Sequence, residues 1–246
     1  MAYQSEEIIP YRQSGDSKKE QVEQMFDAIA GDYDRLNTMM SLSFDKRWRK
    51  NAIRHLNVFR PQLILDIATG TGDFAIQAQR LLHPSKIVAV DISDEMMAVG
   101  KIKVKELFLD QIIDFQHQDC AEMTFPDKEF DAATAAFGVR NFEDLDKSFR
   151  EIWRVLKDGG VFAFLELSVP RRFPMRQLYG FHSRFVIPAL GKLFSKDQRA
   201  YQYLPESIRA FPQGEAMIAI LKKNGFKNVR HKTYTGGVCT LYIAEK

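Results

Sequence analysis

The stretch that decides the fold is Leu63-Ile-Leu-Asp-Ile-Ala-Thr-Gly-Thr-Gly-Asp-Phe74. Its first five residues form an apolar run typical of a buried strand, Gly70 and Gly72 then permit a tight turn, and a helix is expected over 74–82. Glycines let the backbone approach a ligand closely, and the first turn of a helix presents free N–H groups. The stretch therefore predicts a strand–turn–helix pocket for a nucleotide-like ligand.

Two classes of cofactor fit such a pocket. The spacing of Gly70 and Gly72 also matches the dinucleotide fingerprint, which is a weak signal on its own and would indicate an NAD-dependent oxidoreductase. Asp66, however, ends the predicted strand, where a carboxylate suits the amino group or sulfonium of S-adenosylmethionine better than a pyrophosphate. Asp91 ends the next predicted strand and can accept hydrogen bonds from the ribose of either cofactor. We therefore favour S-adenosylmethionine, bound by Asp66, Gly70, Gly72 and Asp91.

Composition sets the broad class of protein. The 246 residues are 45% hydrophobic and 27% charged, which suits one α/β domain, and a net charge of +3 does not argue for a nucleic-acid partner. Cys120 and Cys239 lie far apart and predict reduced thiols, and the five histidines show no metal-ligand spacing, so we expect no metal. The N-terminus is polar and no run of about 18 apolar residues occurs, so we expect a soluble, cytoplasmic protein.

From residue 61 onward, the apolar pattern alternates between strands and helices. Such alternation predicts an α/β fold with a mostly parallel sheet and right-handed crossovers, whose ligands bind at the carboxyl ends of the strands. Two final strands joined by glycines should form an antiparallel hairpin, which fits a methyltransferase sheet better than a dehydrogenase sheet. The predicted strands are 63–67, 86–91, 112–117, 130–136, 161–167, 226–234 and 238–243, and the predicted helices between them are 74–82, 94–107, 145–156 and 213–223.

Residues 1–60 are expected to form an N-terminal helical cap on a cofactor-binding domain, 61–246. A helix is predicted over 18–29, followed by a mixed link over 32–43 and a second helix over 45–56 that Ser43 or Asp45 caps. This second helix is basic and carries Trp48. It is either a solvated face with Trp48 packed inward or a basic surface for anionic lipid or an acidic ligand.

Residues 169–212, which we call the basic insertion, interrupt the strand–helix rhythm. The segment holds eight basic and two acidic residues, a net charge of +6, mixed with large apolar residues and several prolines. Such a mixture is typical of a lid that lies against a membrane surface, and a packed insertion with a solvated basic face is the alternative. His182 within it is a candidate general base, although most such histidines lie at the surface or support packing.

Three motifs resemble those of a known family, the C-methyltransferases of quinone biosynthesis that act on demethylmenaquinone or 2-methoxy-6-polyprenylbenzoquinol. The motifs are Tyr33-Asp-Arg-Leu-Asn-Thr-Met-Met-Ser-Leu-Ser-Phe-Asp-Lys-Arg-Trp48, Phe137-Gly-Val-Arg-Asn141 and Arg154-Val-Leu-Lys-Asp-Gly-Gly-Val-Phe-Ala-Phe-Leu-Glu-Leu-Ser168. Leu36 replaces the family's usual Met and Asp45 replaces its usual His. The resemblance covers the chain from about residue 18 to its last residue, 246.

The resemblance implies a class I methyltransferase fold and methyl transfer from S-adenosylmethionine to a prenylated hydroquinone. Demethylmenaquinol is the preferred acceptor, and 2-methoxy-6-polyprenyl-1,4-benzoquinol of ubiquinone biosynthesis is the alternative, because the motifs serve both. Family cofactor contacts fall on Thr71, Asp91, Asp119 and Cys120. Ala136 stands where the family has a Ser that contacts the cofactor.

The implied chemistry requires an ionised or nearly ionised acceptor. A phenol has a pKa of about 10, so ionisation at neutral pH costs about 4 kcal/mol. A guanidinium beside the oxygen would lower that cost, and Arg140 is our candidate because it follows a strand end. A salt bridge to Asp144 or Glu166 is the alternative role for Arg140. Asn141 could orient the hydroxyl or a water, and Tyr33 could hydrogen-bond either ligand.

The expected partners follow from this chemistry. A prenyl tail partitions into lipid, so we expect transient contact with the inner face of the cell membrane through the basic insertion. A homodimer is a further possible assembly. A module that binds the cofactor without turnover is the non-enzymatic alternative.

Overall fold

The computed structural model describes residues 3–189 and 197–246. Within these ranges the chain forms a seven-stranded sheet with the strand order β3-β2-β1-β4-β5-β7-β6. The strands are β1 Leu63–Ile67, β2 Lys86–Asp91, β3 Ile113–His117, β4 Phe130–Ala136, β5 Leu156–Leu167, β6 Lys227–Tyr234 and β7 Cys239–Glu245. Strands β1 to β5 are parallel, and β7 runs antiparallel to both β5 and β6. The predicted parallel sheet with a C-terminal hairpin is confirmed.

Helices cover both faces of the sheet. On one face, α3 (Phe44–Leu56), α4 (Asp73–Leu82) and α5 (Asp94–Glu106) bury apolar side chains against the strands. On the other, α6 (Leu145–Val155) and α10 (Glu215–Lys223) do the same. The three-layer arrangement explains why the strands read as nearly continuous apolar runs, since both faces of a parallel sheet are buried.

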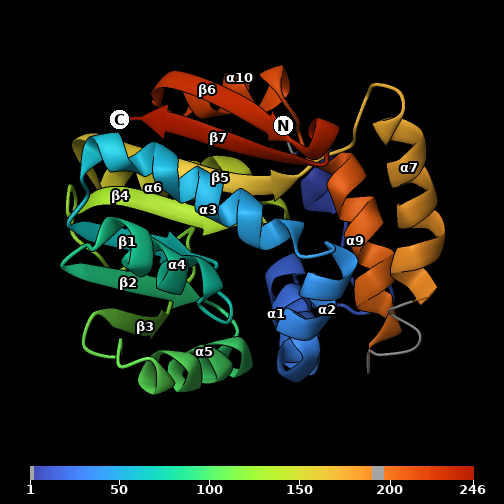
Figure 1. Ribbon diagram of the computed structural model, residues 1–246, viewed down its shortest axis with the longest axis horizontal. Coiled ribbons are helices and arrows are strands. Elements are labelled where there is room, and N and C mark those ends of the chain that lie inside the picture. The colour runs from blue at the N-terminus through green and yellow to red at the C-terminus, as the bar shows by residue number, and fades with distance from the viewer. Residues whose placement is uncertain (1–2, 190–196) are drawn as a thin grey trace.

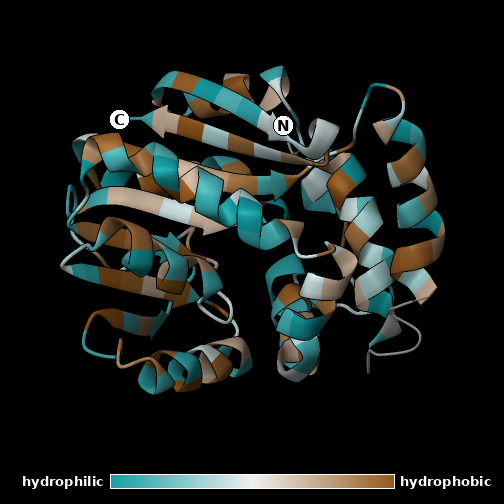
Figure 2. Ribbon diagram, in the orientation of Figure 1, coloured by the Kyte–Doolittle hydropathy of each residue, from teal (hydrophilic) through white to brown (hydrophobic). Residues whose placement is uncertain are grey.

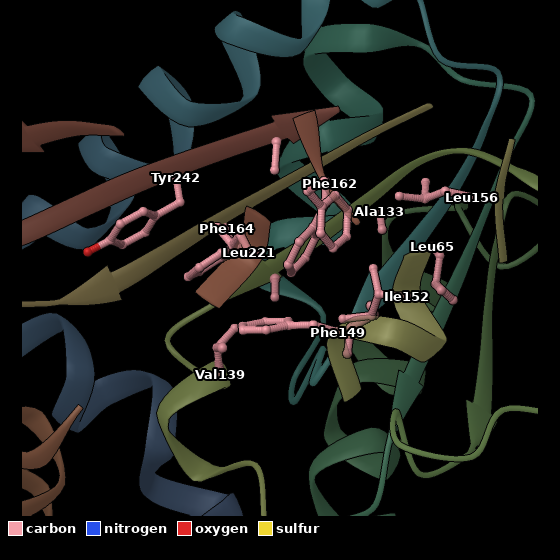
Figure 3. Close-up of a cluster of buried hydrophobic side chains, with 14 of the residues drawn as sticks. Leu65, Ala133, Val139, Phe149, Ile152, Leu156, Phe162, Phe164, Leu221 and Tyr242 are labelled. Atoms are coloured by element: carbon pink, nitrogen blue, oxygen red, sulfur yellow. The ribbon is translucent and has the colours of Figure 1, made fainter. Parts of the chain in front are cut away.

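Aromatic side chains form the centre of the α6 layer. Phe149 and Ile152 of α6 point toward Phe162 and Phe164 of β5 (Figure 3). The rings of Phe162 and Phe164 are 4.9 Å apart, and Tyr242 of β7 lies 4.8 Å from Phe164. Because residues two apart on a strand share a face, this spacing fixes which side of β5 faces α6.

A second group of helices lies at the carboxyl ends of the parallel strands. Figure 1 shows α1 (Lys18–Ile29), α2 (Tyr33–Met40), α7 (Met175–Phe181) and α9 (Gln198–Ala210) together at that end, beyond the arrowheads of β4 and β5. Side chains of α1, α2 and α9, together with Ile187, form a separate core of Met25, Ile29, Leu36, Ile187, Ala200, Tyr201 and Tyr203. The N-terminal helices and the basic insertion thus cover the strand ends jointly.

The N-terminal region differs in detail from its prediction. The link expected over 32–43 contains the helix α2, because Tyr33, Leu36 and Met40 recur at helical spacing and pack into the core of the cap helices. Ser43 precedes α3 in a left-handed conformation and makes no side-chain cap hydrogen bond. Trp48 packs inward, which agrees with the interpretation of this helix as one with a solvated basic face. Helix α3 lies on the sheet beside α4. Across the described residues, no helix is long and apolar enough to span a membrane.

Two turns at the strand ends touch each other closely. A Cβ atom on Gly138, after β4, would lie 2.5 Å from the Cβ of Ala68, after β1. Real Cβ atoms do not approach so closely, so glycine at 138 allows the two turns to meet. These turns carry Gly70 on one side and Arg140 on the other.

Replacing Gly138 with Ala should therefore separate the two turns. We expect Gly138→Ala to lower the free energy of unfolding by about 1–3 kcal/mol, as overpacking does. Denaturant unfolding measures this change. Gly180→Ala in α7 is the matched control, because no atom lies within 4 Å of the added Cβ. Equal stabilities for the two variants would contradict the close approach.

Candidate active site

Two cavities adjoin at the carboxyl ends of the strands. The polar cavity has a volume of about 150 Å³ and is lined by Gly70, Asp91, Asp119, Cys120 and Asn141, among others. The apolar cavity has a volume of about 310 Å³, and its wall includes Trp48, Arg140, Leu178, His182 and Tyr203. Three residues line both cavities, namely Phe26, Tyr33 and Phe137.

Asp91 sits at the end of β2 in the wall of the polar cavity. Its carboxylate accepts hydrogen bonds from the backbone N–H groups of Gly70 at 2.7 Å and Ser93 at 2.9 Å. Burial raises the pKa of Asp91, while these two donors act against that rise. An acid held in this way beside the glycine turn has the position expected for one that binds ribose hydroxyls.

Asp119 and Cys120 border the same cavity after β3. Lys19 of α1 reaches across to Asp119, with 3.2 Å between Nζ and Oδ2, so an N-terminal helix helps to close the cavity. Burial raises the pKa of the Cys120 thiol well above its usual range. A thiol that stays protonated is a poor nucleophile, so Cys120 is a wall residue rather than a reactive one.

Asp66, Thr71 and Gly72 do not reach the wall of either cavity. Asp66 is 1% exposed and accepts hydrogen bonds from the hydroxyls of Thr69 and Thr134, each at 2.6 Å. Burial raises the pKa of Asp66 to about 6. Its carboxylate thus ties the turn after β1 to β4.

Thr71 and Gly72 serve the packing of the same turn. The Thr71 hydroxyl donates to Asp34 of α2 at 2.6 Å. A Cβ on Gly72, whose φ is 77°, would lie 2.7 Å from the Phe115 ring. The structure therefore brings Gly70, Asp91, Asp119 and Cys120 together and places the other three cofactor candidates behind them.

Arg140 lies in the wall of the apolar cavity, and its side chain is buried. Its Nη1 is 2.8 Å from Oε1 of Glu166, and its backbone N–H donates to Oε2 of the same carboxylate at 3.1 Å. Nη1 also donates to the carbonyl of Phe137. The salt bridge to Glu166 considered as an alternative is thus present, in a residue that also faces the cavity.

The other two catalytic candidates occupy different positions. Tyr33 lines both cavities, and burial raises its pKa. Asn141 lines the polar cavity only, and its Oδ1 accepts a hydrogen bond at 3.0 Å from Tyr203, which lines the apolar cavity. That hydrogen bond therefore joins the wall of the apolar cavity to the wall of the polar cavity.

The sequence singled out His182 in the apolar wall as a candidate base, but it did not mark the other residues of this wall as a site. Asp45 and Arg49 form a buried ion pair within α3, and Ser41 donates to Asp45 at 2.7 Å. Their spacing of four residues is the one sequence signal for this pair. Trp48 and Phe137 contact edge to face with 6.2 Å between ring centroids. Their place in a cavity depends on how α3 meets the turn after β4, which no local pattern reveals.

The arrangement suits transfer between two bound molecules. Acids and a close backbone approach serve a polar nucleoside-like ligand, while an apolar chamber with the buried guanidinium groups of Arg49 and Arg140 serves an aromatic ligand with a polar substituent. Because Phe26, Tyr33 and Phe137 separate the two chambers by a single layer of side chains, ligands in both would face each other there.

Comparison with solved structures agrees with this description. A SAM-dependent methyltransferase from Thermotoga maritima superposes with a TM-score of 0.63 at 17% sequence identity, covering 91% of this chain and 99% of the other. The fold is that of the class I S-adenosylmethionine-dependent methyltransferases.

Sequence comparison narrows the class. Residues 14–246 match the ubiE/COQ5 methyltransferase family. The chain is 53% identical over 246 residues to a demethylmenaquinone methyltransferase of Bacteroides fragilis, covering all of both chains. It is 40% identical over 230 residues to the ubiquinone/menaquinone biosynthesis C-methyltransferase UbiE of Geobacter sp. (strain M21), covering 93% of this chain and 97% of the other. The chain belongs to the ubiE/COQ5 methyltransferase family, which confirms the predicted class over the oxidoreductase alternative.

The raised pKa of Asp66 makes stability depend on pH. Its folded-state pKa of about 6 lies above the usual 3.8, so on acidification the folded state takes up this proton before the unfolded state does. The ionised carboxylate costs stability at neutral pH, and that cost disappears as pH falls through about 6. Asp66→Asn lacks this titration. The free energy of unfolding of wild type relative to Asp66→Asn should therefore rise by about 2–3 kcal/mol between about pH 8 and about pH 4.

Denaturant titrations at several pH values measure this difference. Asp110→Asn at an exposed position is the matched control and should show a much smaller pH-dependent difference from wild type. The account of Asp66 would be wrong if both variants followed wild type in parallel across the range.

Proposed function

We propose that this protein transfers the methyl group of S-adenosylmethionine to a ring carbon of a prenylated hydroquinone, with demethylmenaquinol as the acceptor. The observation that carries the proposal is that a polar cavity and an apolar cavity adjoin. The side chains of Phe26, Tyr33 and Phe137, which we call the partition, line both cavities. The name of the Bacteroides fragilis relative supports the naphthoquinol. The name of the Geobacter relative supports the benzoquinol of ubiquinone biosynthesis as the second candidate.

The polar cavity fits the cofactor. Asp91 would accept hydrogen bonds from the ribose hydroxyls, Gly70 would allow the backbone to come close, and Asp119 and Cys120 would border the remainder. S-adenosylmethionine supplies a methyl group that its sulfonium already makes electrophilic. The protein therefore needs to orient the donor rather than activate it, and orientation alone contributes a large part of such rate enhancements.

The apolar cavity fits the acceptor ring. Apolar walls exclude water, so a hydrogen bond to the ring oxygen is stronger there than in solution. Glu166 balances the charge of Arg140, so the guanidinium acts on a phenolic oxygen through directed N–H groups rather than through net charge. A guanidinium has five such hydrogens, and the Glu166 bridge fixes the plane in which they point. Tyr33 at the partition would orient the ring toward the methyl group.

An assay with both acceptors tests the function. Purified protein is incubated with S-adenosylmethionine and either demethylmenaquinol or 2-methoxy-6-polyprenyl-1,4-benzoquinol. The masses of the products are measured by mass spectrometry. We expect a product one methyl group heavier, formed faster from the naphthoquinol. Faster reaction of the benzoquinol would favour the second candidate, and cofactor binding without product from either would favour the binding-module alternative.

In the same assay, Arg140→Lys should separate binding from turnover. Lysine keeps a cation beside Glu166 but lacks the planar fork, so turnover should fall about 100-fold or more, as when an oxyanion donor is removed. Calorimetry should give an unchanged dissociation constant for S-adenosylmethionine. Arg150→Lys on the exposed side of α6 is the matched control. Parallel loss of affinity and turnover, or loss of neither, would refute the role of Arg140.

We further propose that the protein is cytoplasmic and binds the inner face of the cell membrane through the basic insertion. On and beside α7, Phe173, Leu178, Phe181 and Phe185 are exposed, Phe173 by 82%. Hydrophobic and hydrophilic residues both contribute to this helix (Figure 2). Leu178 also lines the apolar cavity, so the exposed face leads to the acceptor chamber. Leu190, Lys192, Leu193, Phe194 and Lys196, which the sequence grouped with this surface, lie outside the described residues.

Exposed arginines of the basic insertion should strengthen binding to anionic lipid. Each basic residue near such a surface contributes about 1 kcal/mol, so replacing Arg171, Arg172 and Arg176 together with Gln should weaken binding about 100-fold. Sedimentation with vesicles containing phosphatidylglycerol measures the affinity. The control replaces the exposed Arg54, Arg60 and Arg80 in the same way. Equal vesicle binding by both triple variants would count against the proposed surface.

A further inference from the structure

Methylation of a ring carbon requires the removal of a proton. The acceptor carbon gains a methyl group and loses its hydrogen, so each turnover releases one proton. The hydroxyl beside that carbon must give up its proton, at least in part, before the carbon can attack. A side chain in the apolar cavity that accepts this proton would complete the machinery, and the argument for it rests on the proposed function.

The described residues that line the apolar cavity offer few groups able to do so. The ionisable side chains in this wall come from every element around it: Tyr33 of α2, Asp45 and Arg49 of α3, Arg140 after β4, Tyr179 of α7, His182 after α7, and Tyr201 and Tyr203 of α9.

Most of these groups are protonated or engaged at neutral pH. The two arginines remain cationic, and tyrosines are ordinarily protonated at neutral pH. Burial raises the pKa of Tyr33, Tyr179 and Tyr203 further. Both carboxylate oxygens of Asp45 are taken, one by Ser41 and the other by Arg49. Among the described wall residues, His182 therefore remains.

His182 has the features of an acceptor. It begins a π-helical turn, His182–Val186, that continues α7, and such turns are frequent at functional sites. Partial burial lowers its pKa below the usual 6.5, so the ring is neutral at pH 7. The backbone of Met40, at the end of α2, acts against this lowering of the pKa, which places the Met40 carbonyl near one ring nitrogen. A neutral imidazole has one nitrogen that donates a hydrogen bond and one that accepts a proton or a hydrogen bond.

We propose that His182 is the catalytic base, which takes the proton of the acceptor hydroxyl while Arg140 stabilises the oxygen. The methyl–sulfur bond breaks as the methyl–carbon bond forms, and S-adenosylhomocysteine leaves with the electron pair of the broken bond. The methylated ring carbon then loses its hydrogen as a proton to solvent, and the imidazolium returns the first proton to the ring oxygen. Atoms balance with one proton released per methyl transferred.

The contact with Met40 also connects the base to the partition. Met40 ends α2, the helix that begins with Tyr33. Docking of the basic insertion against α2 therefore places the base and completes the cavity wall in one step. A prenylated acceptor entering beside α7 would meet His182 and Leu178 on the same segment.

His182→Gln tests the assignment with the full chain, S-adenosylmethionine and demethylmenaquinol. We expect turnover to fall about 100-fold or more, as when a general base is lost, while the dissociation constant for S-adenosylmethionine stays the same. Wild-type turnover should fall on the acid side, because a protonated imidazole cannot accept a proton. In the variant, the limb that reports the imidazole should be replaced by a residual rate that rises steadily with pH toward the acceptor's own pKa of about 10.

Two further experiments distinguish a catalytic base from a residue that only supports the structure. Added imidazole should restore turnover to His182→Ala, since a small molecule can replace a proton acceptor in the cavity but cannot repair misfolding. His231→Gln, on the exposed strand β6, is the matched control and should behave as wild type.

The assignment is overturned if His182→Gln keeps wild-type turnover and its acid limb, or if Asp45→Asn rather than His182→Gln removes that limb. Failure of the function is a different outcome, because wild type would then methylate neither quinol. In that case both the function and the role of His182 fall.

Discussion

The turn that follows β4 places Phe137 and Arg140 in the wall of the apolar cavity. Phe137 adopts a left-handed backbone conformation there, with φ of 66°, which costs a non-glycine residue about 1–2 kcal/mol. Packing against Trp48 and Arg49 offsets this cost, and the carbonyl of Phe137 holds Arg140. Because Phe137 lines both cavities and its neighbour Gly138 abuts Ala68, one short segment sets the separation between the polar cavity and the apolar cavity.

The two chambers have different origins in the chain. Parallel strands form the floor of the polar cavity, where strand ends bring Asp91 and Asp119 to one edge. Helices α1, α2, α3, α7 and α9 form most of the apolar cavity. Lys19 reaches Asp119, and Ser93 donates to Asp27 at 2.5 Å, so polar contacts hold α1 at the strand ends. Lys103 of α5 donates to Asp34 at 2.8 Å and holds α2 against α5. The apolar cavity thus depends on segments outside the sheet.

The strands and turns of the sheet could be predicted because apolar runs and turn glycines are patterns of residues close together in the sequence. Asp91 followed for the same reason, since the carboxyl ends of parallel strands lie at one edge of the sheet, while Asp119 followed from the resemblance to the family. Asp66 also lies at a strand end, but β1 pairs with β4 so that Asp66 opposes Thr134, whose hydroxyl binds it away from the cavity. No local pattern contains that register. Helix α2 and the division of Asn141 and Tyr203 between two cavities likewise depend on contacts between distant segments.

The central claim is that donor and acceptor meet across Phe26, Tyr33 and Phe137. A crystal structure of the protein with S-adenosylhomocysteine and a short-chain demethylmenaquinol tests it most directly. The account predicts the sulfur in the polar cavity and the ring in the apolar cavity, with the acceptor carbon about 3–3.5 Å from the position of the transferred methyl group. A sulfur directed away from Phe137, or a ring bound outside the apolar cavity, would contradict it.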